Sequence, residues 1–488
     1  MRPWGLACLA LLLLGCGSKG SGGAGPSADA GSDAEDPQDF ATITRSCAYT
    51  CPGVASCPES TTPYVCQNTG DWQSIPHAGS CGVWDGGAPP VQHGQCTASA
   101  ATGEAARYAG PDPADAGTVI LPDGRRIAPA GSDWVFDESD LAGGITTYAG
   151  AVGATGLVLT VDDGPGDHAV RVIDPKKIGS GSTPVTGYVK FASPDTLNAS
   201  AAFVSPGTVY VATNDGVVQA LSLDTSTGAL TRTDAGSITL PAGHDGGGNP
   251  GNWYVAGVAA SPDGKRLAVT GVFEHTMLLY DVDPASSTFK QLLGQVGLGD
   301  GETFQVSFDP NDPSGKHAYV SMWADQKVLE IDVSTPATPT VSHTFATDAD
   351  PEGVAFLDAR WMVVANDFGD TLMMVDRSSG TVTSIPIDAS ETLHGTEPST
   401  LAFDPGTKRL YVTWSGRNAV SAYAVDTTQT PPAVTPAGLL PTGWWPSGVV
   451  VQGDGSLVVG EMRGHGTGPR PLYFPIGDSD IDARMRGG

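Results

Sequence analysis

Short apolar runs separated by tight polar turns dominate the pattern along this chain. Residues 354–376 show it most clearly, because apolar runs at 354–356, 361–365 and 372–375 alternate with polar turns. Runs this short, bounded by turn-forming residues, are typical of β-strands, and three in succession predict a small antiparallel meander. Such a unit buries too little apolar surface to be stable alone. We therefore expect it to pack against copies of itself.

Copies of this unit recur from about residue 118 onward. The third strand of each predicted unit ends in an aspartate, and these aspartates are Asp174, Asp224, Asp281, Asp332, Asp376 and Asp426. The second strands recur as well, for example at 209–212, 267–270 and 410–413. A period of about fifty residues leaves room for four strands and their turns. An all-strand repeat of this length predicts the blades of a β-propeller.

Six units are clear, and a seventh around residues 448–462 lacks an outer strand of its own. Residues 118–127 or 134–136 are the candidates to supply that strand, which would remove exposed strand edges. The predicted fold class is therefore all-β, a seven-bladed β-propeller over residues 116–470 preceded by a small disulfide-rich module. Six or eight blades are the alternatives, since the repeats are unevenly spaced.

The first residues have the layout of an export signal. Arg2 precedes an apolar run at 6–14 that is too short to span a bilayer comfortably. Residues 13–16, Leu-Leu-Gly-Cys, resemble a bacterial lipobox, which implies cleavage of a signal peptide (1–15) and lipidation of Cys16. The alternative is an ordinary secretory signal. Residues 16–40 predict a flexible acidic tether, so we expect an outer-membrane lipoprotein of the cell envelope, on its periplasmic or surface face.

Residues 41–100 form a cysteine-rich module. Its six cysteines are Cys47, Cys51, Cys57, Cys66, Cys81 and Cys96. An even number in an exported chain predicts a disulfide framework whose pairing the sequence leaves open. The alternative is a zinc site with His77 and His93, but Cys47 and Cys51 are separated by three residues, not two, and no second close pair of cysteines occurs.

The charge of the chain limits its partners. Its 25 Lys+Arg against 53 Asp+Glu give a net charge of −28, which would repel nucleic acid and anionic membrane surfaces. We expect no nucleic-acid partner. The expected state is a monomer that is tied to the membrane by its lipid and takes a protein or carbohydrate ligand.

Two stretches of the repeat resemble a known family. Residues 261–283 (SPDGKRLAVTG…LLYDVD) and 403–426 (FDPGTKRLYVTWSGRNAVSAYAVD) resemble the repeat of YVTN-type bacterial β-propellers, which include lactonase-like proteins. Residues 118–131 and 440–469 are similar to segments of exported proteins in which a propeller precedes an alkaline-phosphatase-like phosphoesterase domain. The resemblance covers the propeller only. Since the chain ends at Gly488 after a tail at 471–488, we expect a propeller-only member or a truncated product.

Carboxylates recur four residues before the first strand of a unit. The residues at this position are Tyr254, Glu302, Asp350, Glu397 and Trp445, and Glu352 lies beside Asp350. Loops that lead into the innermost strands of a propeller gather around its axis. Glu302, Asp350, Glu352 and Glu397 are therefore the candidate metal ligands, and Ca²⁺ is the cation that such oxygen ligands suit. The alternative is a set of solvated loop acids, and no other cofactor is indicated.

A second set of residues lies in the loops and at the ends of the second strands. The candidate ligand-binding residues are His244, Trp253, Trp323, Asn366, Trp414, Trp445, Glu461 and Arg463. Aromatic side chains of this kind suit carbohydrate, peptide or protein contact, and the alternative is packing of the tryptophans between blades. No HExxH, GxSxG or P-loop motif occurs, so no catalytic residue is predicted.

These features favour a binding or scaffold lipoprotein over an enzyme. The alternatives are an exported metal-dependent hydrolase of the lactonase-like kind and the propeller part of a split phosphoesterase. Propellers host unrelated chemistries, so the fold alone does not choose among them.

Overall fold

The computed structural model describes residues 64–66, 81–83, 110–111, 119–120, 126–134, 145–163, 168–191, 197–204, 206–244, 248, 250–387 and 395–464. The chain divides into two compact units, and the larger one contains residues 110–119 and 126–466. In the smaller unit, strands β1 (Tyr64–Cys66) and β2 (Cys81–Val83) pair antiparallel with Cys66 opposite Cys81. The other four cysteines of the predicted module, and Cys16, lie outside the described residues.

The larger unit is all-β, as the apolar pattern predicted. The described part of the chain contains no α-helix, only the short 3₁₀ turns η3 (Pro175–Lys177), η4 (Asp234–Gly236), η5 (Trp323–Asp325) and η6 (Ser415–Arg417). No helix long and apolar enough to cross a membrane is found among the described residues.

Its strands form successive antiparallel sheets in which neighbours in sequence are neighbours in the sheet. The first is β6 (Ile145–Ala151), β7 (Val158–Asp163), β8 (His168–Ile173) and β9 (Val185–Phe191). The second is β10 (Leu197–Val204), β11 (Thr208–Thr213), β12 (Val217–Leu223) and β13 (Leu230–Arg232), with β14 (Ile238–Thr239) also on β12. The third is β17 (Val255–Ala260), β18 (Arg266–Gly271), β19 (Thr276–Asp281) and β20 (Leu292–Gly297).

The fourth sheet is β21 (Thr303–Phe308), β22 (His317–Met322), β23 (Lys327–Asp332) and β24 (Thr340–Ala346). The fifth is β25 (Pro351–Phe356), β26 (Trp361–Asn366), β27 (Thr371–Asp376) and β28 (Thr381–Ile385), so the stretch at 354–376 forms three of its strands, as predicted. The sixth is β29 (Pro398–Asp404), β30 (Arg409–Trp414), β31 (Ala419–Asp426) and β32 (Ala433–Pro441). The last is β33 (Trp444–Val451) with β34 (Leu457–Gly464).

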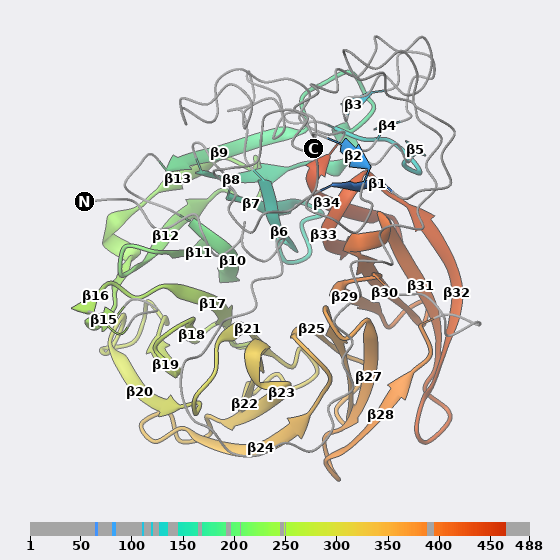
Figure 1. Ribbon diagram of the computed structural model, residues 1–488. Helices are drawn as coiled ribbons and strands as arrows, with labels where there is room; N and C mark the ends of the chain where they lie inside the picture. The colour runs from blue at the N-terminus through green and yellow to red at the C-terminus, as the bar shows by residue number, and fades with distance from the viewer. Residues whose placement is uncertain are drawn as a thin grey trace. The chain divides into compact units, whose positions relative to one another are not determined.

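The first strands of these sheets form a closed ring. Contacts run in order from β6 through β10, β17, β21, β25 and β29 to β33, and β33 contacts β6 again. Figure 1 shows the sheets arranged around this ring. The strands approach closely enough to require glycine, since a Cβ on Gly353 would lie 2.3 Å from the carbonyl oxygen of Ser399 on the neighbouring strand. The fold is therefore propeller-like.

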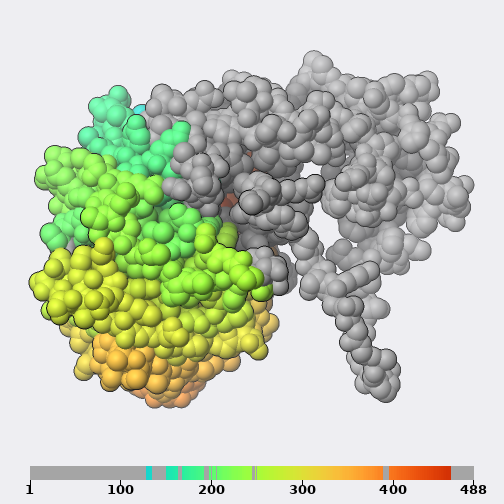
Figure 2. All heavy atoms as spheres, turned by 90° about the vertical axis from the view of Figure 1, so that its left-hand side faces the viewer, coloured from blue at the N-terminus to red at the C-terminus, as the bar shows by residue number. Residues whose placement is uncertain are grey.

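The hydrophobic core is divided among the spaces between neighbouring sheets. One cluster joins Val161 and Val209 of the first two sheets, and another joins Val363 and Val412 of the fifth and sixth. A smaller cluster joins Val158 to Val450, and so links the first sheet to the last. Figure 2 shows the described residues of successive sheets packed directly against one another. Each sheet is thus stable only with its neighbours, as expected for a unit this small.

The repeated aspartates cap the turns that follow the third strands. Asp224 accepts hydrogen bonds from the backbone N–H and hydroxyl of Ser226, at 2.9 and 2.6 Å, and Asp426 accepts the same pair from Thr428. These bonds lower the pKa of both carboxyls, that of Asp224 to about 2. The repeat therefore marks a turn that a short acidic side chain closes.

The described strands within residues 118–127 do not supply the predicted outer strand of the last sheet. Strands β4 (Val119–Ile120) and β5 (Arg126–Ile127) pair in a separate small sheet with β3 (Gly110–Pro111), not with β34. Trp134 is in no strand, and residues 135–136 lie outside the described part. Among the described residues β34 has β33 as its sole strand partner and is half-buried along 457–462, whereas β11 and β18 are mostly buried.

Candidate functional site

The two sets of residues picked out by the sequence lie at the same end of the sheets. Each first strand begins opposite the end of its second strand, as the pairs Thr303↔Met322, Pro351↔Asn366 and Pro398↔Trp414 show. We call this the leading end. It comprises the connections between sheets (240–254, 298–302, 347–350, 395–397 and 442–443) and the turns between second and third strands (214–216, 272–275, 323–326, 367–370 and 415–418).

The leading end is strongly acidic. The acidic residues in the described parts of these segments are Asp215, Glu274, Asp300, Glu302, Asp325, Asp348, Asp350, Asp367, Asp370 and Glu397. Arg417 is the one lysine or arginine in the same described segments. At the opposite end, the described turns between first and second strands and between third and fourth strands hold equal numbers of acidic and basic residues. Among the described turns and connections, the net negative charge is therefore concentrated at the leading end.

Three of these carboxylates interact with Glu352, which lies in β25. Burial raises the pKa of Glu352 well above its usual range, and the charges of Asp367, Asp350 and Glu397 add to the effect. Burial followed by repulsion from Glu397 and Asp350 raises the pKa of Asp367 to about 8. Because the Glu352 side chain is partly exposed, its desolvation comes from the protein that surrounds it inside the ring rather than from sealing against water.

Glu302 and Glu397 complete the predicted metal set. Burial and the charge of Glu302 raise the pKa of Asp350. The four predicted ligands are thus electrostatic neighbours. Among the described residues, however, no group of three or more His, Cys, Asp or Glu side chains is arranged to hold a metal ion. Binding of Ca²⁺ by these four carboxylates stays a prediction.

Three residues of the aligned set share an uncommon backbone conformation. Asp350, Glu397 and Trp445 have φ of 58°, 47° and 63°. Residues other than glycine seldom adopt this left-handed conformation, because the Cβ is crowded by the following carbonyl. The shared conformation shows that the three positions are structurally equivalent, although two carry a carboxylate and one an indole.

The predicted aromatic rim is only partly exposed. Trp253, Trp414 and Asn366 are 4%, 1% and 0% exposed, so they pack within the unit. Trp323 is half-buried, and its ring lies 6.2 Å from that of Phe368, which is 51% exposed. Phe368 was not among the ligand-binding residues predicted from the sequence, although its position directly after Asp367 in the same turn would have made it a candidate.

The remaining predicted ligand-binding residues are separated around the leading end. His244 lies in β15 (Gly243–His244), which pairs with β16 (Pro250–Gly251), and it lies near Glu274, whose pKa is raised by burial. Glu461 accepts a hydrogen bond from the backbone N–H of Gly443 at 2.5 Å. Burial and then the charge of Asp133 raise the pKa of Glu461 to about 7. Arg463 lies in β34, and its side chain is outside the described part.

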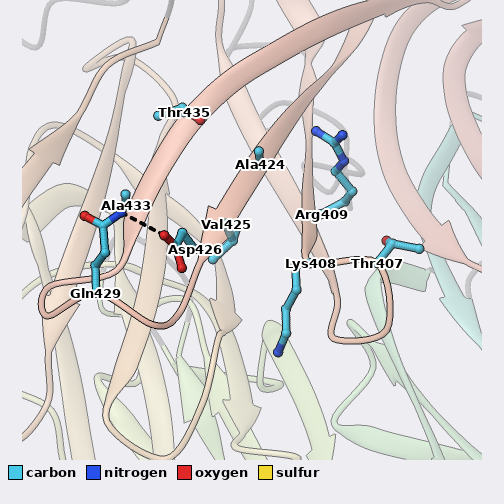
Figure 3. A pocket seen from close by; sticks show the side chains of 9 residues that line it. All are labelled: Thr407, Lys408, Arg409, Ala424, Val425, Asp426, Gln429, Ala433 and Thr435. Atoms are coloured by element: carbon cyan, nitrogen blue, oxygen red, sulfur yellow. Dashed lines mark hydrogen bonds between the residues drawn. The ribbon is translucent and has the colours of Figure 1, made fainter.

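A pocket of about 390 Å³ lies at the opposite end of the sixth sheet, away from these residues. Its lining residues are Thr407, Lys408, Arg409, Ala424, Val425, Asp426, Gln429, Ala433 and Thr435. In Figure 3 the Gln429 amide donates to the Asp426 carboxylate, at 2.7 Å. None of the site residues predicted from the sequence lines this pocket.

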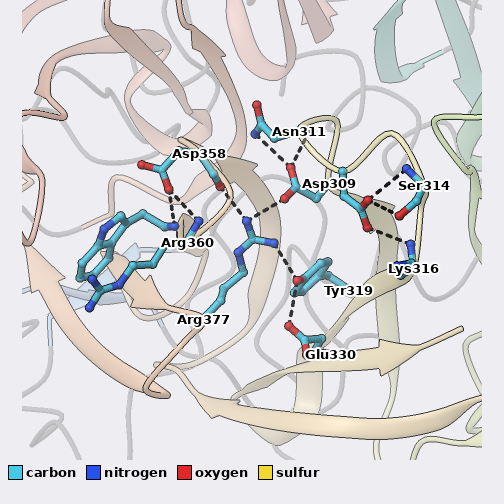
Figure 4. Close-up of polar contacts among 11 residues, drawn as sticks. Asp309, Asn311, Ser314, Lys316, Tyr319, Glu330, Asp358, Arg360 and Arg377 are labelled. Atoms are coloured by element: carbon cyan, nitrogen blue, oxygen red, sulfur yellow. Dashed lines mark hydrogen bonds and ion pairs between the residues drawn. The ribbon is translucent and has the colours of Figure 1, made fainter. Parts of the chain in front are cut away.

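A buried charge network at the opposite end joins the fourth and fifth sheets. The Arg377 guanidinium donates to the Tyr319 hydroxyl and to the Asp309 carboxylate, both at 2.7 Å, and to the carbonyl oxygen of Asp358 at 2.6 Å. The Tyr319 hydroxyl donates in turn to Glu330, at 2.8 Å (Figure 4). Because Arg377 and Asp309 are both buried, the network is a structural link between sheets.

Comparison with known proteins supports the fold. No sequence model of a known family matches the chain, and no curated protein matches it. A proposed 6-phosphogluconolactonase from Bacteroides fragilis is similar in structure, with 16% identity over 70% of this chain and 96% of that one and a TM-score of 0.51. A protein from Lactobacillus plantarum (16% identity, 70% and 97% covered, TM-score 0.50) and the WD40 repeats of RRP9 (11%, 67% and 90%, TM-score 0.50) are also similar. At this identity the likeness shows the fold alone, a β-propeller.

Proposed function

We propose that this chain is a cell-envelope lipoprotein whose seven-bladed β-propeller binds a positively charged organic ligand at its leading end. A basic peptide segment and a polyamine are the two ligand types of this chemistry. The observation that carries the proposal is the concentration of mutually perturbed carboxylates around Asp350, Glu352 and Asp367, beside the exposed ring of Phe368.

The raised pKa values indicate which charge the site lacks. The carboxyl of Asp367, with a pKa of about 8, holds its proton at neutral pH, and burial and neighbouring acids raise the pKa of Glu352 in the same direction. A cation that took the place of a bound proton at these carboxyls would relieve the repulsion and pair with the ionised groups. The rings of Phe368 and Trp323, 6.2 Å apart, favour an organic cation, which can lie against an aromatic face.

The envelope location rests on the sequence. The lipobox-like residues 13–16, the tether at 16–40 and the six cysteines of residues 41–100 support an exported, lipid-anchored protein with disulfides. The YVTN-type repeat and the likeness to propeller–phosphoesterase proteins support a binding module that acts together with other envelope proteins.

A hydrolase of the lactonase-like kind is the second candidate. It is favoured by the pKa values of about 8 for Asp367 and about 7 for Glu461, which suit proton transfer near neutral pH. The described residues offer no metal site to accompany it. A lactone-turnover assay with Asp367→Asn and Glu461→Gln tests this candidate, which predicts turnover by the wild type and its loss in a variant. If the chain is instead the propeller part of a split phosphoesterase, a phosphoesterase gene should lie beside its own.

Isothermal titration with spermine tests the binding proposal. The test variant is the double substitution Asp350→Asn/Glu352→Gln. The matched control, Asp263→Asn/Asp454→Asn, removes the same number of carboxyl groups from the opposite end. We expect wild type and control to bind with similar affinity, the test variant to bind about tenfold more weakly, and binding to weaken with salt. Equal affinity of the two double variants, or no binding by the wild type, would show that the leading end is not the cation site.

A further inference from the structure

One residue in each described turn between a second and a third strand has the same unusual conformation. His275, Gln326, Asp370 and Asn418 have φ of 48°, 51°, 50° and 54°, and Gly216 at the same place has 79°. Glycine is the residue that adopts this conformation without steric cost, and Gly216 shows that the chain uses it. The other four positions have a polar side chain despite the steric cost of this conformation, which indicates that some of these side chains have a role of their own.

The backbone carbonyl of these residues accepts an equivalent hydrogen bond in several sheets. The carbonyl oxygens of His275, Gln326 and Asn418 accept the N–H of the residue directly after the fourth strand, which is Leu298, Thr347 or Thr442, at 2.8 to 2.9 Å. The carbonyl oxygen of Gly216 accepts the N–H of Leu240 at 2.8 Å in the same way. These bonds extend the ladder between third and fourth strands and need no side chain.

The side chains reach further, to the connection that leads into the next sheet. His275 Nδ1 is 2.7 Å from the carbonyl oxygen of Gly301. Asn418 Oδ1 accepts the N–H of Trp445 at 3.0 Å. No hydrogen bond to a described residue is found for the side chain of Gln326.

Asp370 makes the largest set of these bonds. One carboxylate oxygen accepts the N–H of Thr396, the N–H of Glu397 and the Thr396 hydroxyl, at 2.6, 3.0 and 2.8 Å. The other accepts the N–H of Gly395 at 2.7 Å. The partners of the three side chains are thus Gly301, residues 395–397 and Trp445, which directly precede or include Glu302, Glu397 and Trp445 of the aligned set.

We propose that His275, Asp370 and Asn418 are positioning residues, each holding the ligand-facing residue of the next sheet in place from the sheet before it. The function of that arrangement rests on the proposed binding role of the leading end. The geometry of the site is then set between sheets rather than within them, and the left-handed turn residue is the part that sets it.

Asn418→Gly isolates this side chain. Glycine keeps the left-handed turn and the bond from Thr442 N–H to the carbonyl oxygen of residue 418. It removes the side-chain bond to Trp445 together with the packing of a side chain that is 3% exposed. Amide hydrogen exchange by NMR should therefore accelerate about five- to tenfold at Trp445, the loss of one hydrogen bond, and stay within about twofold at Thr442. Gln326→Gly is the matched control, and it should leave Trp445 unchanged.

Equal acceleration at Trp445 and Thr442 would show a merely structural role, and unchanged exchange at Trp445 would remove the proposal. Spermine affinity is the second readout: Asn418→Gly should weaken it about threefold or more, whereas Gln326→Gly should not. If the wild type binds no spermine, the proposed function fails, and the exchange measurement still decides whether Asn418 positions Trp445.

Discussion

Asp367→Asn should stabilise the protein in alkaline solution. The substitution keeps the shape of the protonated carboxyl and removes its ability to ionise beside Glu397 and Asp350. The pKa of Asp367 is raised from 3.8 to about 8. Because the pKa is raised in the folded state, the contribution of the protonated carboxyl to the free energy of unfolding is complete below pH about 4 and is lost as the pH rises through about 8. Asparagine cannot ionise, so the variant keeps this contribution at high pH.

The magnitude follows from the pKa difference. Each pH unit between folded and unfolded pKa values corresponds to about 1.4 kcal/mol, so a difference of about four units sets an upper limit of about 6 kcal/mol. Asp367 is half-buried, and solvent screens its interactions. We therefore expect about 2 kcal/mol of added stability at pH 9 and about 0.5 kcal/mol at pH 5. For a unit of this size the larger figure corresponds to about 5 °C in Tm.

Thermal unfolding of wild type and Asp367→Asn in parallel at pH 5, 7 and 9 measures the effect. The matched control is Asp376→Asn. Hydrogen bonds from Arg360 lower the pKa of Asp376, so its loss should destabilise the protein at neutral pH. An Asp367→Asn variant that is no more stable than wild type at pH 9, or equally stabilised at pH 5 and pH 9, would refute the reasoning.

Two buried side chains and one pair of cysteines give three further predictions. Arg377→Met leaves Asp309 buried without its partner and should cost about 3 to 5 kcal/mol in urea unfolding; a cost below about 1 kcal/mol would contradict a structural network. Trp414→Phe should cost about 1 kcal/mol and leave spermine affinity unchanged, because Trp414 is buried and its indole N–H has no partner in the described structure. Cys66 and Cys81 are directly opposite on β1 and β2. Paired residues of antiparallel strands have Cα atoms about 4.5 to 5.5 Å apart, a separation that suits a disulfide. Mapping of non-reduced peptides should therefore recover the two cysteines linked, and finding either one joined elsewhere would exclude the pair.

The strands were predictable because their signal is local. The apolar runs at 354–356, 361–365 and 372–375 correspond to β25, β26 and β27, since alternating short runs and turns specify a strand wherever they occur. The aspartates that marked the repeat were visible too, because the turn that each one caps follows it directly in sequence.

Only part of the site could be predicted from the sequence, because its electrostatics and burial depend on residues that are far apart in the chain. The alignment found Asp350 and Glu397, but their effect on Asp367 depends on the distance between neighbouring sheets. Trp414 ends a second strand and Trp323 directly follows one, so the two look alike in the sequence, but Trp414 is buried and Trp323 is half-buried. The left-handed turn residues gave no signal, since Asp370 and Asn418 are ordinary loop residues until their partners in the next sheet are known.

Proton release on binding tests the central claim most directly. If a cation takes the place of bound protons at Asp367 and its neighbour Glu352, addition of spermine to the weakly buffered protein at pH 7 should release protons. The release should be smaller in Asp350→Asn/Glu352→Gln, which lacks one of these two carboxyls and one of their acidic neighbours. Saturation by spermine without proton release, or an equal release from that double variant, would contradict the claim that these carboxyls form the binding site.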